Sequence, residues 1–202
     1  MIYKEICINH SKTGINRNWN CTKASKLNEF VKKYQNKEVE LYTSYYDFHK
    51  DLITHLETHN CMTDFKGDYI LNEIILDIDL LFDTYDDLLK IVKYHIDFII
   101  DELNCNKNQI KPYFSGTGFH IHIPNIFDFK PSNDLPLIVR KKLLSLFPRC
   151  DTIYNNYSLI RLPNTWNRKS KLYKIPLSIN EITNMNIDEI KFIAKKPRLN
   201  FE

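Results

Sequence analysis

Two short segments of this chain alternate between apolar and polar side chains, a period typical of strands rather than helices. The first, Glu-Ile-Ile-Leu-Asp-Ile-Asp-Leu, places Asp77 and Asp79 two residues apart, and the second, Gly-Phe-His-Ile-His-Ile-Pro, places His120 and His122 two residues apart. Side chains two apart on a strand project from the same face. Each segment therefore predicts a strand with a polar pair on one face and branched or aromatic side chains on the other.

The composition is that of a globular protein with a substantial core. The 202 residues are 43% hydrophobic and 13% aromatic, enough for one domain or for one domain built from two modules. The net charge of +3 does not identify a nucleic-acid binder, although local basic clusters could still form a phosphate-binding face.

The cysteines and the hydropathy pattern indicate where such a chain resides. Five cysteines without any CxxC pair argue against a zinc ribbon or a disulfide framework and favour isolated, reduced thiols. We find no signal peptide and no long apolar run, and therefore expect a soluble, cytoplasmic protein that does not bind membranes.

The first third of the chain predicts a small α/β module over residues 1–66. Strands are expected over 2–8 and 38–43, and a helix between them carries an apolar stripe of Leu27, Phe30, Val31 and Tyr34. Ser44 and Asp47 resemble a capping box that would open a second helix through Phe48, Leu52 and Leu56. The polar stretch 59–68 contains Gly67 and predicts a module boundary.

The remainder, 67–202, predicts a second module in the order strand, helix, strand, strand, helix, strand. Thr84 and Asp87 are expected to cap its first helix. Strands are predicted over 69–80, 110–115, 118–124, 157–162 and 172–178. The first predicted helix has an apolar stripe of Leu88, Val92, Ile96, Ile99 and Leu103, and the second, over 134–147, has one of Leu137, Ile138, Leu144 and Phe147. A last short helix is predicted from Ile187 to Ala194. This order is the ferredoxin-like, or RRM-like, pattern, so the expected fold class is mixed α+β.

Asp77 and Asp79 are the first candidates for chemistry. Two carboxylates on one face of an apolar strand repel each other unless a cation or a proton lies between them, and Mg²⁺ or Mn²⁺ suits such oxygen ligands. Asp151 is a third acidic candidate that would complete a two-metal site. The alternatives are a solvated strand end for the pair and a turn or capping role for Asp151.

The segment before the two histidines predicts an anion site. Gly116 and Gly118 are two of the chain's four glycines, and with Ser115 they would expose backbone N–H groups in a tight turn. An isolated His-x-His is more typical of a half-exposed strand, but together with this turn His120 indicates a triphosphate pocket.

A basic stretch follows near the end of the chain. Arg161 lies in an apolar segment, which is costly unless it meets an anion. Arg168, Lys169, Lys171 and Lys174 cluster beside Trp166 and Tyr173, a pattern that suits nucleotides or single-stranded nucleic acid. For Arg168 and Lys171 a solvated loop is the simpler interpretation.

Over residues 70–178 the chain resembles the archaeo-eukaryotic primase superfamily, which contains the primase-polymerases and the small subunit of DNA primases. The resemblance is carried by Leu76-Asp77-Ile78-Asp79, by Ser115-Gly116-Thr117-Gly118-Phe119-His120, by Cys150-Asp151 and by the later segments Arg161-Leu162-Pro163-Asn164 and Lys174-Ile175-Pro176-Leu177. The cysteine spacings provide no counterpart of the zinc-binding element found in many cellular primases.

The resemblance implies a template-dependent nucleotidyltransferase that makes short RNA or DNA on single-stranded DNA from NTPs or dNTPs. Asp77, Asp79 and Asp151 would hold two divalent ions, Mg²⁺ or Mn²⁺. The triphosphate would be contacted by Ser115, Gly116, Gly118 and His120 and neutralised by Arg161, Lys169 and Lys174, with His122 as support. We expect helicase loading and initiation to need separate partners, a helicase or an accessory primase subunit.

Two other classes of protein remain open. A metal-dependent nuclease or phosphoesterase could use His120 and His122 with Asp77 and Asp79, but this leaves Ser115 and the basic stretch without a role. A third alternating histidine, as in histidine-triad hydrolases, is missing because position 124 is Pro. A non-catalytic nucleic-acid-binding module on a ferredoxin-like sheet would place acidic residues on its inner strand, where they repel phosphate.

Overall fold

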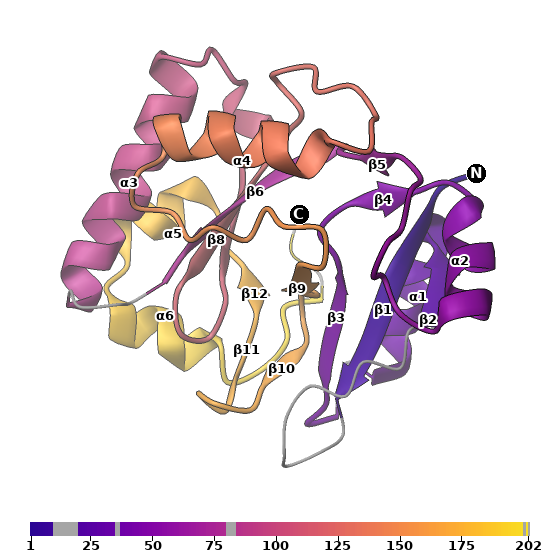
Figure 1. Ribbon diagram of the computed structural model, residues 1–202. Helices are drawn as coiled ribbons and strands as arrows, with labels where there is room; N and C mark the ends of the chain where they lie inside the picture. The colour runs from indigo at the N-terminus through magenta and orange to yellow at the C-terminus, as the bar shows by residue number, and fades with distance from the viewer. Residues whose placement is uncertain (10–19, 35–36, 80–83, 200, 202) are drawn as a thin grey trace.

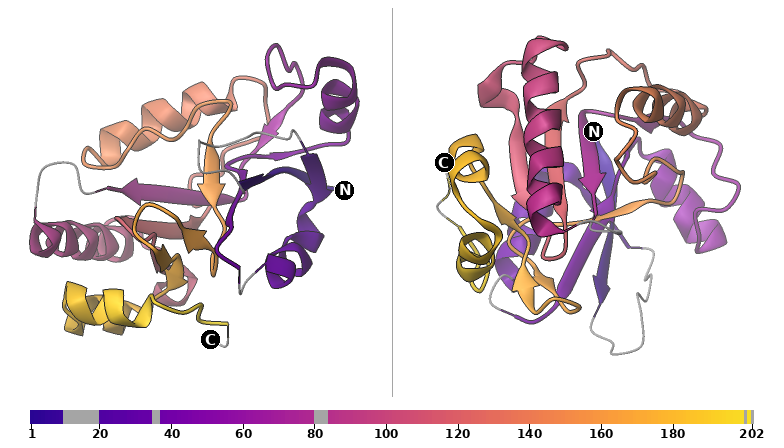
Figure 2. Two further views of the ribbon diagram at one scale, coloured as in Figure 1. Left: turned by 90° about the horizontal axis from the view of Figure 1, so that it is seen from below. Right: turned by 90° about the vertical axis from the view of Figure 1, so that its left-hand side faces the viewer.

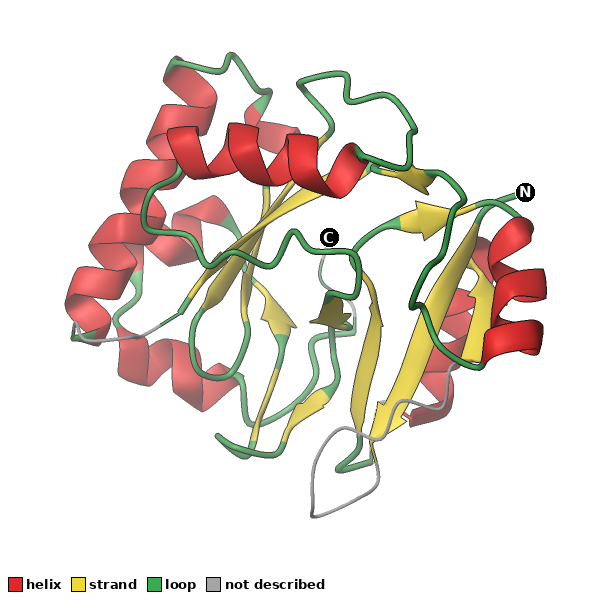
Figure 3. Ribbon diagram, viewed as in Figure 1, coloured by secondary structure: helices red, strands yellow, loops and turns green. Residues whose placement is uncertain are grey.

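The computed structural model describes residues 1–9, 20–34, 37–79, 84–199 and 201. Two antiparallel sheets lie side by side with helices around them, and a short two-stranded ribbon of β10 (Trp166–Asn167) and β11 (Leu172–Tyr173) joins them (Figures 1 and 3). This confirms the mixed α+β class.

The first sheet has the order β5-β4-β1-β3-β9, with β2 paired to β1. Its strands are β1 (Tyr3–Asn9), β2 (Asn20–Lys23), β3 (Glu40–Ser44), β4 (Asp47–Phe48), β5 (Tyr69–Ile70) and β9 (Leu159–Arg161). A short 3-10 turn, η1 (Ala24–Lys26), leads into α1 (Leu27–Tyr34). The predicted stripe of α1 is confirmed, because Leu27, Phe30, Val31 and Tyr34 pack on a small core of Val39, Leu41 and Leu162.

The second sheet has the order β12-β7-β8-β6 and holds most of the core. Its strands are β6 (Glu73–Ile78), β7 (Lys111–Phe114), β8 (Phe119–Pro124) and β12 (Ile175–Pro176), and η2 (Lys107–Gln109) precedes β7. The long helix α3 (Tyr85–Asp101) lies along one face of this sheet (Figure 2). Thr84 caps α3 by accepting from the N–H of Asp87, as predicted, and the helix buries Leu88, Val92, Ile96 and Ile99.

The predicted helix start at Ser44 is wrong. Ser44 ends β3, and its hydroxyl donates to the Tyr46 carbonyl while accepting from the Glu5 N–H. Asp47 lies in β4 and pairs with Lys4 at 2.8 Å. Both side chains are thus used by the sheet, and α2 (Asp51–His59) begins later, after Lys50.

The ferredoxin-like strand order is not confirmed. Strands β6, β8 and β7 are neighbours as that arrangement requires, but a fourth strand should lie beside β6. Instead β9 pairs with β3 of the first sheet, and β12 pairs with β7 at the opposite edge. The predicted strand over 69–80 is also divided, because β5 joins the first sheet and β6 the second; Leu80 lies outside the described residues.

The division into 1–66 and 67–202 stays a prediction. Strands β5 and β9 come from the second range but belong to the first sheet, and one core contains residues from both ranges, among them Phe48 and Ile74.

Helix α4 (Leu135–Leu146) is present where predicted but rotated. It buries Leu135, Val139 and Leu143, a row spaced by four residues, and leaves Leu137 and Ile138 of the predicted stripe exposed. Phe147 of that stripe, directly after the helix, is buried as predicted. The terminal helix α6 (Ile187–Ile193) is confirmed, and a capping box of Ser178 and Glu181 opens an additional helix, α5 (Ile179–Asn184). Among the described residues no helix is long and apolar enough to cross a membrane.

Candidate functional site

Three carboxylates from distant parts of the chain meet at the end of β6. Asp77 lies in β6, Asp79 follows the strand directly, and Asp151 lies in the segment after α4. One carboxylate oxygen from each lies within 4.8 Å of the others. The Asp151 N–H donates to the Asp77 carbonyl oxygen at 2.7 Å, so the segment after α4 is fixed to the strand by its backbone. The predicted convergence of these three side chains is therefore found.

The charge balance of this cluster fits a cation. Burial and then the neighbouring Asp77 and Asp151 raise the pKa of Asp79 to about 6, against the opposing charges of Lys169 and Arg161. Asp77 Oδ1 is buried without a hydrogen-bond partner. Carboxylate oxygen atoms that repel one another are the ligands that Mg²⁺ and Mn²⁺ prefer. The residues present thus fit a divalent ion.

The Ser-Gly-Thr-Gly turn lies against this cluster. Ser115 closes the turn, since its N–H donates to the Gly118 carbonyl at 2.8 Å and its hydroxyl accepts from the Gly118 N–H at 3.0 Å. Only glycine fits at position 118, because the backbone of the turn lies so close to the end of β6 that a Cβ there would overlap the Ile78 carbonyl oxygen and lie 2.6 Å from Asp79 Oδ1. Gly116 has a φ of +101°, which favours glycine.

Two N–H groups of the turn are available to an anion. Within the described residues no hydrogen bond uses the backbone N–H of Gly116 or Thr117. Turns of this kind bind phosphate through such groups. Asn167 stabilises the turn, because its side-chain amide donates to the Ser115 carbonyl at 3.0 Å.

His120 lies opposite Asp77 in the antiparallel ladder between β6 and β8. Its Nε2 is 3.2 Å from Asp77 Oδ1, although off the line of a hydrogen bond, and its Nδ1 accepts from Lys174 Nζ at 2.9 Å. Burial would raise the pKa of Asp77, but His120, Lys174 and Arg161 hold it below its ordinary value. His120 Nδ1 is thus occupied by Lys174 while Nε2 faces Asp77, so a phosphate contact would replace one of these neighbours.

Lys174 has no exposed surface, and all its protons have acceptors. Besides His120 it lies 3.4 Å from His122 Nε2 and donates to the Arg161 carbonyl at 2.9 Å. His122 Nδ1 in turn is 2.7 Å from a Glu73 oxygen. We call the row Asp77, His120, Lys174, His122 and Glu73 the buried relay. Direct neutralisation of a triphosphate by Lys174, as the sequence suggested, would require these side chains to move.

The buried relay holds its histidines neutral. Burial, followed by the charge of Lys174, lowers the pKa of His120, and the same two causes lower that of His122 to about 3. Burial also lowers the pKa of Lys174 itself to about 7, although Asp77 and Glu73 act in the opposite direction. Neutral imidazoles that accept from Lys174 must carry their protons on the nitrogens that face Asp77 and Glu73.

Arg161 meets an anion, as its apolar setting required. Its guanidinium donates to Glu40 at 3.1 Å and to the Tyr42 hydroxyl at 2.8 Å in the first sheet, and to the Ser115 carbonyl at 3.2 Å in the second. Arg161 therefore joins the two sheets beside the glycine turn. Lys169 is exposed, and its charge acts on Asp79 from outside the sheet.

The sequence missed four residues that complete the site. Glu73 and Tyr113 follow the two-residue alternation of β6 and β7 and could have been found on that basis. Glu40 and Asn167 gave no local signal, because their roles depend on contacts with Arg161 and Ser115, each more than 50 positions away. In the comparisons with known proteins no family model matches the chain, and no curated protein matches it.

Proposed function

We propose that this chain is a metal-dependent nucleotidyltransferase of the primase-polymerase kind, which extends or initiates short strands of RNA or DNA on single-stranded DNA. The observation that carries the proposal is the convergence of Asp77, Asp79 and Asp151 within 4.8 Å, next to a glycine turn with free N–H groups. Three carboxylates beside an anion cradle match the needs of phosphoryl transfer, which depends on positioning and charge neutralisation.

Each group has a defined task in the proposed reaction. The three carboxylates would hold Mg²⁺ or Mn²⁺, which supplies activation of the attacking 3′-hydroxyl and neutralisation of the leaving pyrophosphate. The turn at Ser115–Gly118 binds the triphosphate through backbone N–H groups, and the exposed Lys169 adds positive charge near Asp79. The buried relay holds the His120 ring beside Asp77, with Nε2 3.2 Å from Oδ1.

The proposal includes the partners and the location expected from the sequence. Nucleoside triphosphates and a single-stranded DNA template are the substrates, and a helicase or an accessory primase subunit would load the chain on its template. The cytoplasm is where we expect the chain to find them.

One assay separates the proposed activity from the alternatives. The chain is incubated with a single-stranded template, with and without a primer, and with NTPs or dNTPs and Mg²⁺ or Mn²⁺. Growth of labelled product supports the proposal, shortening of the template indicates a nuclease, and a mobility shift without turnover indicates a binding module. His122 is turned towards Glu73 and Lys174, which disfavours the mixed histidine and carboxylate site of the nuclease alternative.

Variants test the metal site itself. Asp77→Asn and Asp151→Asn should each lower product formation by more than about a hundredfold, beyond the effect typical of residues that only support metal ligands. Mn²⁺ should raise the melting temperature of the wild type but not of either variant. Asp101→Asn, at an exposed carboxylate where α3 ends, is the control and should respond like the wild type. Full activity of Asp77→Asn would refute the proposal.

A further inference from the structure

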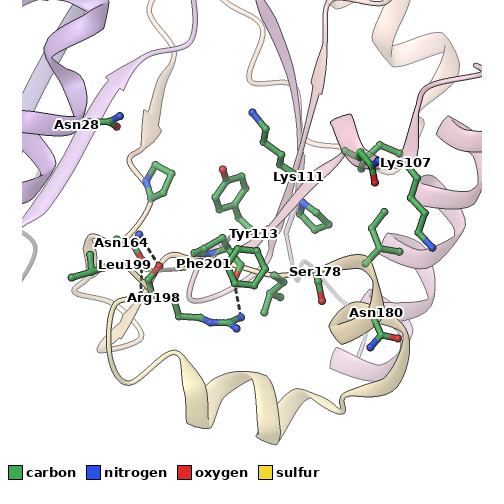
Figure 4. A pocket seen from close by; sticks show the side chains of 17 residues that line it. Asn28, Lys107, Lys111, Tyr113, Asn164, Ser178, Asn180, Arg198, Leu199 and Phe201 are labelled. Carbon is green, nitrogen blue, oxygen red and sulfur yellow. Dashed lines mark hydrogen bonds between the residues drawn. The ribbon is translucent and has the colours of Figure 1, made fainter.

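A second cavity lies at the sheet edge opposite the acidic cluster. Its volume is about 710 Å³, within the range of small-ligand sites. Strand β7 forms one wall and the β12–α5 junction another, while Asn28 of α1, the turn at Pro163–Asn164 and the side chains of Arg198, Leu199 and Phe201 complete it (Figure 4). Asp77, Asp79 and Asp151 do not line this cavity, and β8 lies between its β7 wall and Asp77 on β6.

The cavity carries positive charge without a carboxylate. Lys107, Lys111 and Arg198 line it, and none of the lining residues in the described part of the chain is Asp or Glu. Lys107 is exposed, and Lys111 has a side chain that is 61% exposed and lies 3.8 Å from Glu73. Four asparagines, at positions 28, 108, 164 and 180, add amide donors. Such a lining attracts an anion.

Two aromatic rings complete the cavity. Lys111 and Tyr113 are two apart on β7, and both project into it (Figure 4). The Tyr113 ring packs against the buried relay, with its centroid 4.5 Å from that of His122 and 5.0 Å from Lys174 Nζ. Phe201 lies over the Arg198 guanidinium at 4.4 Å, and Arg198 is itself held by Glu181 at 2.9 Å. Aromatic rings beside cations suit a flat base joined to a phosphate.

We propose that this cavity binds a nucleoside phosphate, with Lys111 and Lys107 at the phosphate and the base against Tyr113 and Phe201. The ligand is either a free nucleotide or a nucleotide within a single strand, which present the same chemistry to the cavity. The site does not depend on transfer at the acidic cluster, and it would give the chain a second contact with nucleic acid or nucleotide on the far edge of the sheet.

Binding is measured with the full chain in EDTA, so that no divalent ion contributes, by titration with AMP, with ribose 5-phosphate and with a short oligothymidylate. Lys111→Ala should weaken binding of AMP or of the oligonucleotide about tenfold, which corresponds to the loss of one charged contact. Lys141→Ala removes the same charge from the exposed side of α4 and should change binding by less than about twofold.

Phe201→Ala tests the base contact, and loss of folding is not expected because Phe201 is only partly buried and belongs to neither core cluster. It should weaken AMP binding and leave ribose 5-phosphate binding unchanged. Tighter binding of the oligonucleotide than of AMP assigns a strand, and the reverse assigns a free nucleotide. The proposal is overturned by absence of binding of both, by equal effects of Lys111→Ala and Lys141→Ala, or by equal effects of Phe201→Ala on AMP and ribose 5-phosphate.

Asp77→Asn tests whether AMP binds at this cavity or at the acidic cluster. The variant should keep its affinity for AMP in EDTA, whatever its effect on product formation. Loss of AMP binding in this variant would place the ligand at the acidic cluster and refute the second site. A wild type without transferase activity but with the expected effect of Lys111→Ala would refute the proposed function alone.

Discussion

Lys174 is a buried lysine whose charge state should be visible in the stability of the protein. Its ammonium group has no exposed surface and contacts two imidazoles and one carbonyl. Lys174→Met removes the titrating group while keeping an unbranched side chain of similar length. The comparison of the two proteins as a function of pH isolates the ionisation of this one residue.

The magnitude follows from the two pKa values of the lysine. Burial lowers the pKa of Lys174 from 10.5 to about 7 in the folded chain. Between these values the unfolded chain binds one proton more than the folded chain, so the free energy of unfolding rises with pH by about 1.4 kcal/mol per pH unit. From pH 7 to pH 9 the free energy of unfolding of the wild type should therefore rise by roughly 2 kcal/mol relative to that of Lys174→Met. The slope is smaller near pH 7 because the folded lysine is still partly protonated there.

Urea denaturation at several pH values between 7 and 9 measures this difference. Groups that titrate in both proteins cancel when the two free energies are subtracted. Lys141→Met, at an exposed lysine of α4, serves as the control. If the difference in free energy of unfolding between wild type and Lys174→Met does not change between pH 7 and pH 9, the lysine has an ordinary pKa and the buried relay does not exist as described.

Three further substitutions test the local geometry by the same denaturation assay. Gly118→Ala should lower the free energy of unfolding by about 1–3 kcal/mol, because its Cβ would overlap the Ile78 carbonyl oxygen; an unchanged value would refute the close approach of the turn to β6. Asn167→Ala leaves the Ser115 carbonyl with one donor fewer and should cost about 1–3 kcal/mol, and it should weaken triphosphate binding at the turn more than it affects template binding. Thr84→Ala removes the cap of α3 and should cost about 0.5–2 kcal/mol, whereas a loss under a few tenths would show that the cap is made by water instead.

Local patterns predicted most of the elements and the centre of the site. The alternation around Asp77 and His120 located β6 and β8, and their antiparallel register then placed the two side chains opposite each other. The scarce glycines located the turn. Thr84 located the start of α3, because a cap depends on residues three positions apart.

Other features could not be read locally, for identifiable reasons. Ser44 and Asp47 have the spacing of a cap, but hydrogen bonds to β1 and an ion pair with Lys4 were more favourable than opening a helix. Leu137 and Ile138 are as apolar as the residues that α4 buries, and only the position of the neighbouring core decides which side of the helix turns inward.

The sequence by itself determined which residues are polar on an otherwise apolar strand, where the chain must turn, and which three acidic residues were candidates for one cluster. The tertiary structure alone decided that β9 would leave the second sheet for the first, that Arg161 would meet Glu40, and that Lys174 would be enclosed between two histidines. The physical reason is that strand pairing and charge burial are long-range interactions, whose energies depend on partners that no local pattern identifies.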